Sequence, residues 1–111
     1  MKATLRTLVI LSGFVSASAG GGVAGWTEPA SVIALEANEL ARFVVRLDVD
    51  KNASGCRDPN WFYADYGRSG SALMYQTLLE AFLHERKVRL YVTGVCDLKG
   101  YSGISAARIQ R

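Results

Sequence analysis

The sequence has little of several residue types on which common protein functions depend. Its 111 residues include one histidine, two cysteines and two prolines. There is no C-x-x-C motif, and His84 is distant in sequence from Cys56, so neither a redox-active thiol pair nor a Cys/His metal site is predicted. The scarcity of proline and the 50% share of hydrophobic residues exclude a disordered chain and predict one packed domain.

Catalytic patterns are missing as well. No serine or cysteine lies in a nucleophile motif, and the single histidine, His84, falls in the last turn of a predicted helix, where it compensates the helix dipole. Glu80 and Glu85 are five residues apart and therefore lie on different faces of that helix, which makes them a poor acid and base pair. We predict that the protein is not an enzyme and uses no cofactor.

The N-terminus predicts export. A short positive region, Met1–Arg6, precedes an apolar stretch, Thr7–Val15, which is too short to span a bilayer. Ala17-Ser18-Ala19 then matches a signal-peptide cleavage pattern. We expect residues 1–19 to be a cleaved signal peptide and residues 20–29 a flexible N-terminal segment. The mature protein would then be periplasmic or secreted, with no membrane span.

Removal of this leader also lowers the charge. The formal net charge of +3 falls by two when Lys2 and Arg6 are removed, because the leader contains no acidic residue. The dense basic cluster that remains, residues 86–89, lies where the helix gives way to a strand. Nucleic-acid binding is not expected, since phosphate recognition needs a basic stripe rather than a single corner.

The two cysteines predict a disulfide. Both Cys56 and Cys96 remain after cleavage, and an even number of cysteines in an oxidising compartment typically pairs. Only one connectivity exists, so we predict a Cys56–Cys96 bond.

Hydrophobic periodicity predicts a mainly β protein with one helix. Phe43, Val45 and Leu47 alternate with polar residues, and leucines and aromatic residues recur every three or four positions from Ser71 to Glu85. Ser69 or Ser71 is the expected helix cap. The predicted strands are 30–36, 41–49, 61–66, 88–96 and 102–110, with a bulge or an edge position in the last strand.

Three strands, a helix and two strands form the order of the OB-fold, a small five-stranded Greek-key barrel. We therefore predict a single OB-like domain over residues 30–111. The alternative is an open α+β sheet with the helix on one face, because periodicity does not decide whether the sheet closes.

A dense aromatic stretch, Trp61–Tyr66, provides the candidate ligand surface. On a strand, Trp61, Tyr63 and Asp65 share one face, and flat aromatic rings beside an acid suit sugar rings. The alternative is that Trp61 and Tyr63 belong to the core.

Two further segments resemble a known family. The helical run SALMYQTLLEAF, residues 71–82, and the strand KVRLYVTGVC, residues 87–96, are similar to the helix and fourth strand of small exported bacterial proteins. Those proteins are related to the B subunits of subtilase-cytotoxin and pertussis-like toxins, and Gly103-Ile104-Ser105 adds to the likeness. The resemblance implies an OB-fold, assembly into a pentameric ring and glycan binding. The sugar-contacting residues of those subunits have no matching positions in this chain.

Two functions are compatible with these observations. The first is an exported, non-enzymatic binding module similar to toxin B subunits, glycan-binding and ring-forming through the helix 71–85, whose apolar arc is wide enough for a core and a subunit contact. The alternative is a small periplasmic structural or stress-related protein that binds no sugar.

Overall fold

The computed structural model describes residues 22–111, so the predicted signal peptide, residues 1–19, lies outside the described part of the chain. The predicted order of three strands, a helix and two strands is confirmed. One short strand precedes them within the segment that was expected to be flexible. The elements are β2 (Gly25–Trp26), β3 (Ala30–Ala37), β4 (Arg42–Leu47), β5 (Trp61–Asp65), α1 (Ser71–His84), β6 (Lys87–Val92) and β7 (Ser102–Gln110).

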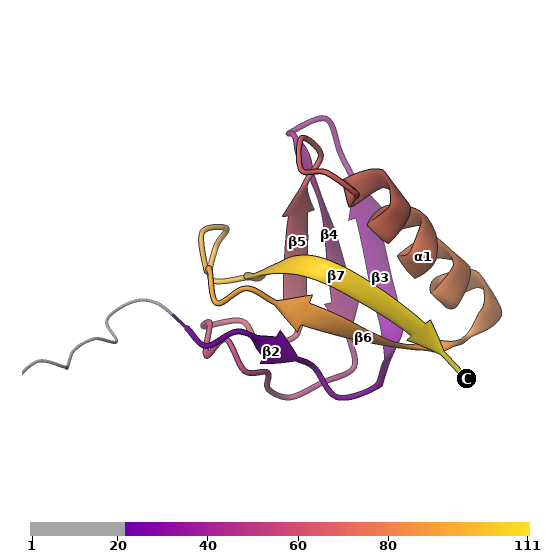
Figure 1. The fold of residues 1–111 in the computed structure, drawn as a ribbon, viewed down its shortest axis with the longest axis horizontal. Coiled ribbons are helices and arrows are strands. Elements are labelled where there is room, and N and C mark those ends of the chain that lie inside the picture. The colour runs from indigo at the N-terminus through magenta and orange to yellow at the C-terminus, as the bar shows by residue number, and fades with distance from the viewer. Residues whose placement is uncertain (1–21) are drawn as a thin grey trace, which may run out of the picture.

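The five long strands close into a barrel. Around it the order is β3-β4-β5-β7-β6, and β6 returns to β3. The β5–β7 pair is parallel, and the other neighbours are antiparallel. In Figure 1, β3, β4 and β5 form one layer, and β6 and β7 cross over it. This architecture confirms the OB-fold-like barrel, and the alternative of an open sheet is wrong.

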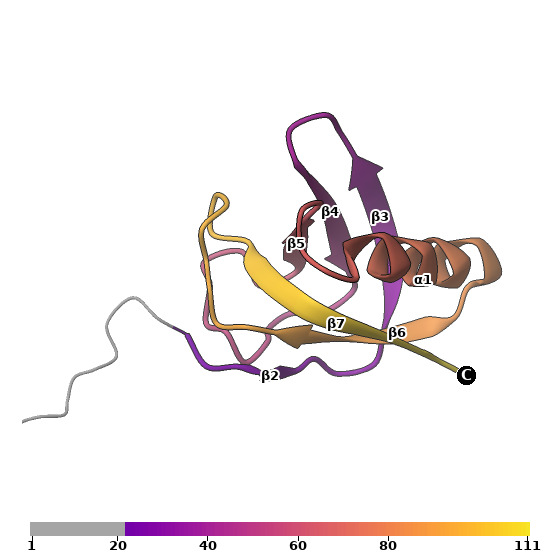
Figure 2. The ribbon, with the colours of Figure 1, turned by 45° about the horizontal axis from the view of Figure 1, so that its top comes forward.

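The core lies between these layers. Phe43, Val45 and Leu47 of β4 are fully buried, as the alternating pattern predicted, and they meet Phe62 of β5. Helix α1 packs against β3 and β7 (Figure 2) and contributes Leu78 to the core. Burial of this apolar surface, at about 25 cal/mol per Å², is the main force that holds the helix on the barrel.

Both ends of α1 use left-handed backbone instead of a serine cap. The N-cap residue is Gly70 with φ 82°, and no side chain in the described part of the chain caps the helix. The prediction of Ser69 or Ser71 as the cap was therefore wrong. At the other end Glu85, with φ 54°, donates its backbone N–H to the Ala81 carbonyl.

A disulfide joins the two long loops on one side of the barrel. The predicted Cys56–Cys96 bond is confirmed, with a Cα–Cα distance of 5.6 Å. It connects the β4–β5 loop, residues 48–60, to the β6–β7 loop, residues 93–101. The Ser54 and Ser102 hydroxyls, 2.8 Å apart and buried, tie the same loop to the start of β7. These links hold the β6–β7 loop close to the outer surface of β5.

Candidate ligand-binding groove

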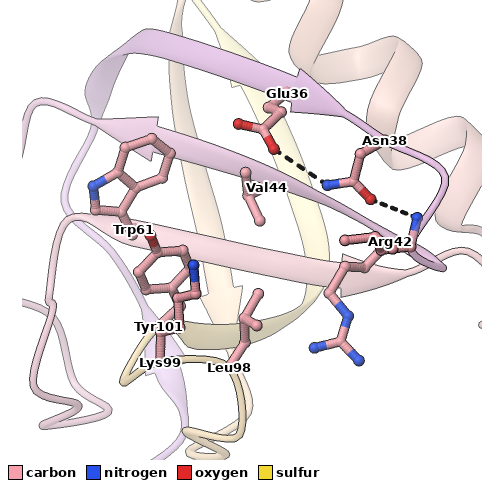
Figure 3. A pocket seen from close by; sticks show the side chains of 9 residues that line it. Glu36, Asn38, Arg42, Val44, Trp61, Leu98, Lys99 and Tyr101 are labelled. Atoms are coloured by element: carbon pink, nitrogen blue, oxygen red, sulfur yellow. Dashed lines mark hydrogen bonds between the residues drawn. The ribbon is translucent and has the colours of Figure 1, made fainter.

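The outer face of β4 and β5 carries polar and aromatic side chains beside a hollow. Since Phe43 and Phe62 point into the core, their neighbours Arg42, Val44 and Trp61 point outward. The β3–β4 loop and the β6–β7 loop rise on either side and enclose a groove of about 280 Å³ (Figure 3). We call it the β4 groove; its lining is Glu36, Asn38, Leu40, Arg42, Val44, Trp61, Leu98, Lys99 and Tyr101.

The aromatic side of the groove is a stacked pair. The rings of Trp61 and Tyr101 lie 5.4 Å apart with an interplanar angle of 13°. The Arg46 guanidinium lies over the Trp61 ring at 5.9 Å from its centroid, a cation–π contact. These contacts fix the orientation of the indole at one end of the groove (Figure 3).

The opposite side of the groove is polar and held by hydrogen bonds. Asn38 donates from Nδ2 to Glu36 Oε2 at 3.2 Å and accepts the Leu40 backbone N–H on Oδ1 at 2.8 Å (Figure 3). The Asn38 backbone N–H in turn donates to the Tyr66 hydroxyl at 2.9 Å. The loop thereby presents Glu36 and Asn38 in a defined arrangement before any ligand binds.

The wall formed by the β6–β7 loop is also anchored. Its tip, Lys99-Gly100, has positive φ at both residues, the geometry of a tight two-residue turn. Asp58 donates its backbone N–H to the Gly100 carbonyl at 3.0 Å, and the Arg57 guanidinium donates to the Lys99 carbonyl. With the nearby disulfide, these bonds hold Leu98 and Tyr101 at the groove.

The three residues predicted as a ligand surface share the outer face of β5 but divide between two hollows. Trp61 lines the β4 groove, whereas Tyr63 and Asp65 line a separate hollow bounded by Arg68 and Asp97. Tyr63 is only 7% exposed. Asp65 is engaged by Arg42, whose Nε lies 3.2 Å from its Oδ1.

Tyr63 also has an altered acidity. Burial raises the pKa of its phenol above the ordinary 10.0, and a backbone hydrogen bond with Asp97 lowers it in partial compensation. The carboxylates of Asp97 and Asp65 add to the rise, and the Arg42 guanidinium, 5.4 Å from the ring centroid, opposes it. The phenol therefore stays protonated at neutral pH and can donate a hydrogen bond.

Sequence reasoning did not identify most of the β4 groove. Glu36, Asn38 and Arg42 belong to the β3–β4 hairpin, whereas Leu98 and Tyr101 come from the β6–β7 loop, and only the folded barrel brings these two distant stretches together. For Arg42, the alternating pattern of β4 did indicate that the side chain points outward. For the loop residues there was no periodic signal.

The other candidates from the sequence do not form a second reactive site. Exposed His84 lies with its Nε2 3.3 Å from Glu80 Oε1, one helical turn earlier, a contact between two surface side chains. Among residues 22–111, no three His, Cys, Asp or Glu side chains are grouped so as to hold a metal ion. Within the same range, no helix is both long and apolar enough to cross a membrane.

Comparison with known proteins adds no identification. No protein-family model matches the chain, and no curated protein is significantly similar to it. The relationship to exported toxin B subunits, and any function taken from it, stays a proposal.

Proposed function

We propose that this protein is an exported, non-enzymatic binding module and that it binds a sugar in the β4 groove. The position of the groove is the observation that carries the proposal. OB-fold barrels bind oligosaccharides and oligonucleotides on their second and third strands, between the loops that follow the first and fourth strands. Here those strands are β4 and β5, and the corresponding loops both line the groove.

The chemistry of the groove favours a sugar over a fully apolar ligand. Val44, Leu98 and the Trp61–Tyr101 pair offer apolar surface to the C–H face of a pyranose ring. Glu36 and Asn38 offer hydrogen-bond acceptors and donors to its hydroxyl groups. The volume of about 280 Å³ suits a ligand of one or two rings rather than a long chain.

The test of the site uses the two tryptophans as a matched pair. D-Galactose, D-glucose, N-acetyl-D-glucosamine and their short oligomers are titrated into ¹⁵N-labelled protein, and amide chemical shifts are followed by NMR. We expect shifts in residues 36–44 and 98–101. Trp61→Phe should weaken binding roughly tenfold, the value of one lost aromatic contact, whereas Trp26→Phe, outside the groove, should not. Absence of shifts with every sugar contradicts the proposal.

We also propose that the module assembles into a pentameric ring through α1. The helix carries large apolar side chains that the barrel leaves exposed: Leu73 is 68% and Leu83 62% exposed, and Phe82 is 44% exposed. Multivalent presentation would raise the avidity of individually weak sugar sites. Size exclusion with light scattering should give about five times the mass of one chain. A monomeric mass contradicts the ring.

One observation favours the alternative, a small periplasmic structural or stress-related protein without a sugar ligand. Tyr63 is buried, and the Trp61 ring is already in contact with Tyr101 and Arg46. Aromatic rings used in this way stabilise the outer surface of the barrel rather than present a free platform. A monomer that also shows no sugar-induced shifts would support this function.

A further inference from the structure

The outer face of the β6–β7 pair carries several positively charged side chains. They come from two parts of the sequence, the start of β6 and the end of β7. Val88 and Leu90 point into the core, so Lys87 and Arg89 point outward. The register places Arg89 directly opposite Arg108 of β7. Figures 1 and 2 show the start of β6 beside the C-terminal end of β7. We call this face the basic ribbon; its cations are Lys87, Arg89 and Arg108.

These cations have no carboxylate partners among the described residues. The ion pairs between residues 22 and 111 join Arg42 to Asp65, Arg57 to Asp58 and His84 to Glu80. All three lie outside the basic ribbon. Two like charges directly opposite each other on a sheet are destabilising, so the Arg89–Arg108 pair requires compensation from elsewhere.

Trp26 of β2 provides that compensation. The Arg108 guanidinium lies 4.6 Å, and that of Arg89 5.9 Å, from the centroid of the indole. Arg89 Nε also donates to the Thr27 carbonyl at 2.8 Å, and Tyr91 packs edge-on against the indole. Arg108 is therefore held by the ring, and Arg89 by the ring and a carbonyl, and neither partner carries a negative charge that would neutralise the guanidinium groups.

We propose that the basic ribbon binds a linear acidic polysaccharide, through its sulfate or carboxylate groups. Lys87 and Arg89 are successive outward residues of β6 and lie roughly 7 Å apart, and Arg108 lies beside Arg89, so the three cations form one continuous stretch of positive charge. A guanidinium held against a ring can still form bidentate contacts with an oxyanion through its free N–H groups. The site is separate from the β4 groove and does not depend on sugar binding there.

Two features favour a polysaccharide over other polyanions. Single-stranded nucleic acid binds through bases stacked on open aromatic faces, and here guanidinium groups already lie over the Trp26 ring. A lipid bilayer presents a plane, whereas these cations lie on the curved outer surface of a barrel.

The test uses heparin as the probe, with protein purified from cells that express the full chain. Affinity is measured by isothermal titration calorimetry at low and at physiological salt. Arg89→Gln/Arg108→Gln should weaken heparin binding by roughly tenfold or more, because two charge-assisted contacts are lost. The matched control is Arg68→Gln, which removes an exposed cation that forms no ion pair with any of residues 22–111 and lies outside the ribbon. It should change affinity less than about twofold.

Further measurements make the outcome decisive. Uncharged dextran should not compete with heparin for the basic ribbon, and binding to heparin should weaken as salt rises. Thermal unfolding of each variant verifies that it is folded, and Arg108→Gln alone, at an exposed position, provides a milder second variant. Equal heparin affinity in wild type and in both ribbon variants would overturn the proposal. Tighter binding of poly-dT, or of vesicles rich in phosphatidylserine, would also overturn it. Loss of heparin binding with unchanged sugar-induced shifts in the β4 groove separates this site from the proposed function.

Discussion

At the scale of single residues, position on a strand does not by itself determine burial. Val44 and Tyr63 point away from the core, yet both are buried, at 6% and 7% exposure. They are opposite each other in the β4–β5 register. Leu98 lines the hollow above Val44, and Gly103 lies against the Tyr63 ring, where a Cβ would come within 3.3 Å of the hydroxyl. The β6–β7 loop and the start of β7 thus cover these two side chains, which lie outside the main core.

The buried Tyr63 predicts a pH effect on stability. Because burial raises the phenol pKa in the folded state, the unfolded chain loses its proton first as pH rises beyond 10.0. The stabilisation of the folded state by the protonated Tyr63 phenol is fully present below that pH and decreases as pH rises toward the folded-state pKa. The free energy of unfolding, measured with guanidinium between pH 9 and 10.5, should decrease less in Tyr63→Phe than in wild type. Tyr66→Phe, at an exposed tyrosine, serves as the control, and identical slopes for all three proteins would refute the assignment.

At the scale of secondary-structure elements, periodicity located the elements, and tertiary contacts set their ends. The helix was predicted from Ser71 to Glu85 and ends at His84. The irregularity predicted in the last strand is present as a bulge, because Tyr91 pairs with Ala106 and Val92 with Ile104, which leaves Ser105 unpaired. The strand β2 was missed, since two residues carry no periodic signal and their pairing depends on β6.

The two left-handed residues that bound α1 predict opposite effects of substitution. Glu85 has φ 54°, a conformation that costs a non-glycine residue energy, so Glu85→Gly should raise the free energy of unfolding by about 0.5–1 kcal/mol. Gly70 has φ 82° and no atom within 4 Å of an added Cβ, so Gly70→Ala should lower it by about 1 kcal/mol through backbone strain alone. Thermal and denaturant unfolding of both variants test this. If Glu85→Gly instead lowers the free energy of unfolding, the Glu85 side chain stabilises the fold by more than its left-handed backbone conformation destabilises it.

At the scale of the whole molecule, the barrel closes between strands that are distant in sequence. β3 pairs with β6, and β5 runs parallel to β7. The disulfide acts at the same scale, because it closes a loop of 40 residues between two loops on the groove side.

Removal of the disulfide should destabilise the whole domain. The chain-entropy model gives about 4 kcal/mol for a loop of this length, so Cys56→Ser/Cys96→Ser should unfold at a clearly lower guanidinium concentration. Replacement of both cysteines leaves no free thiol, and reduced wild-type protein is the independent comparison. The β6–β7 loop should also lose order, visible as altered amide shifts at residues 98–101. Unchanged unfolding midpoints in the variant and in the reduced protein would contradict a stabilising role.

The amino-acid pattern by itself determined the class of fold, the order of the main elements and the pairing of Cys56 with Cys96. These follow from local periodicity and from a cysteine count that permits one connectivity. The tertiary structure alone decided that the sheet closes, that Trp61 stacks on Tyr101, and that Arg89 faces Arg108. Each of these depends on the register between strands separated by many residues. Register is set by packing over the whole core, and no local segment encodes it.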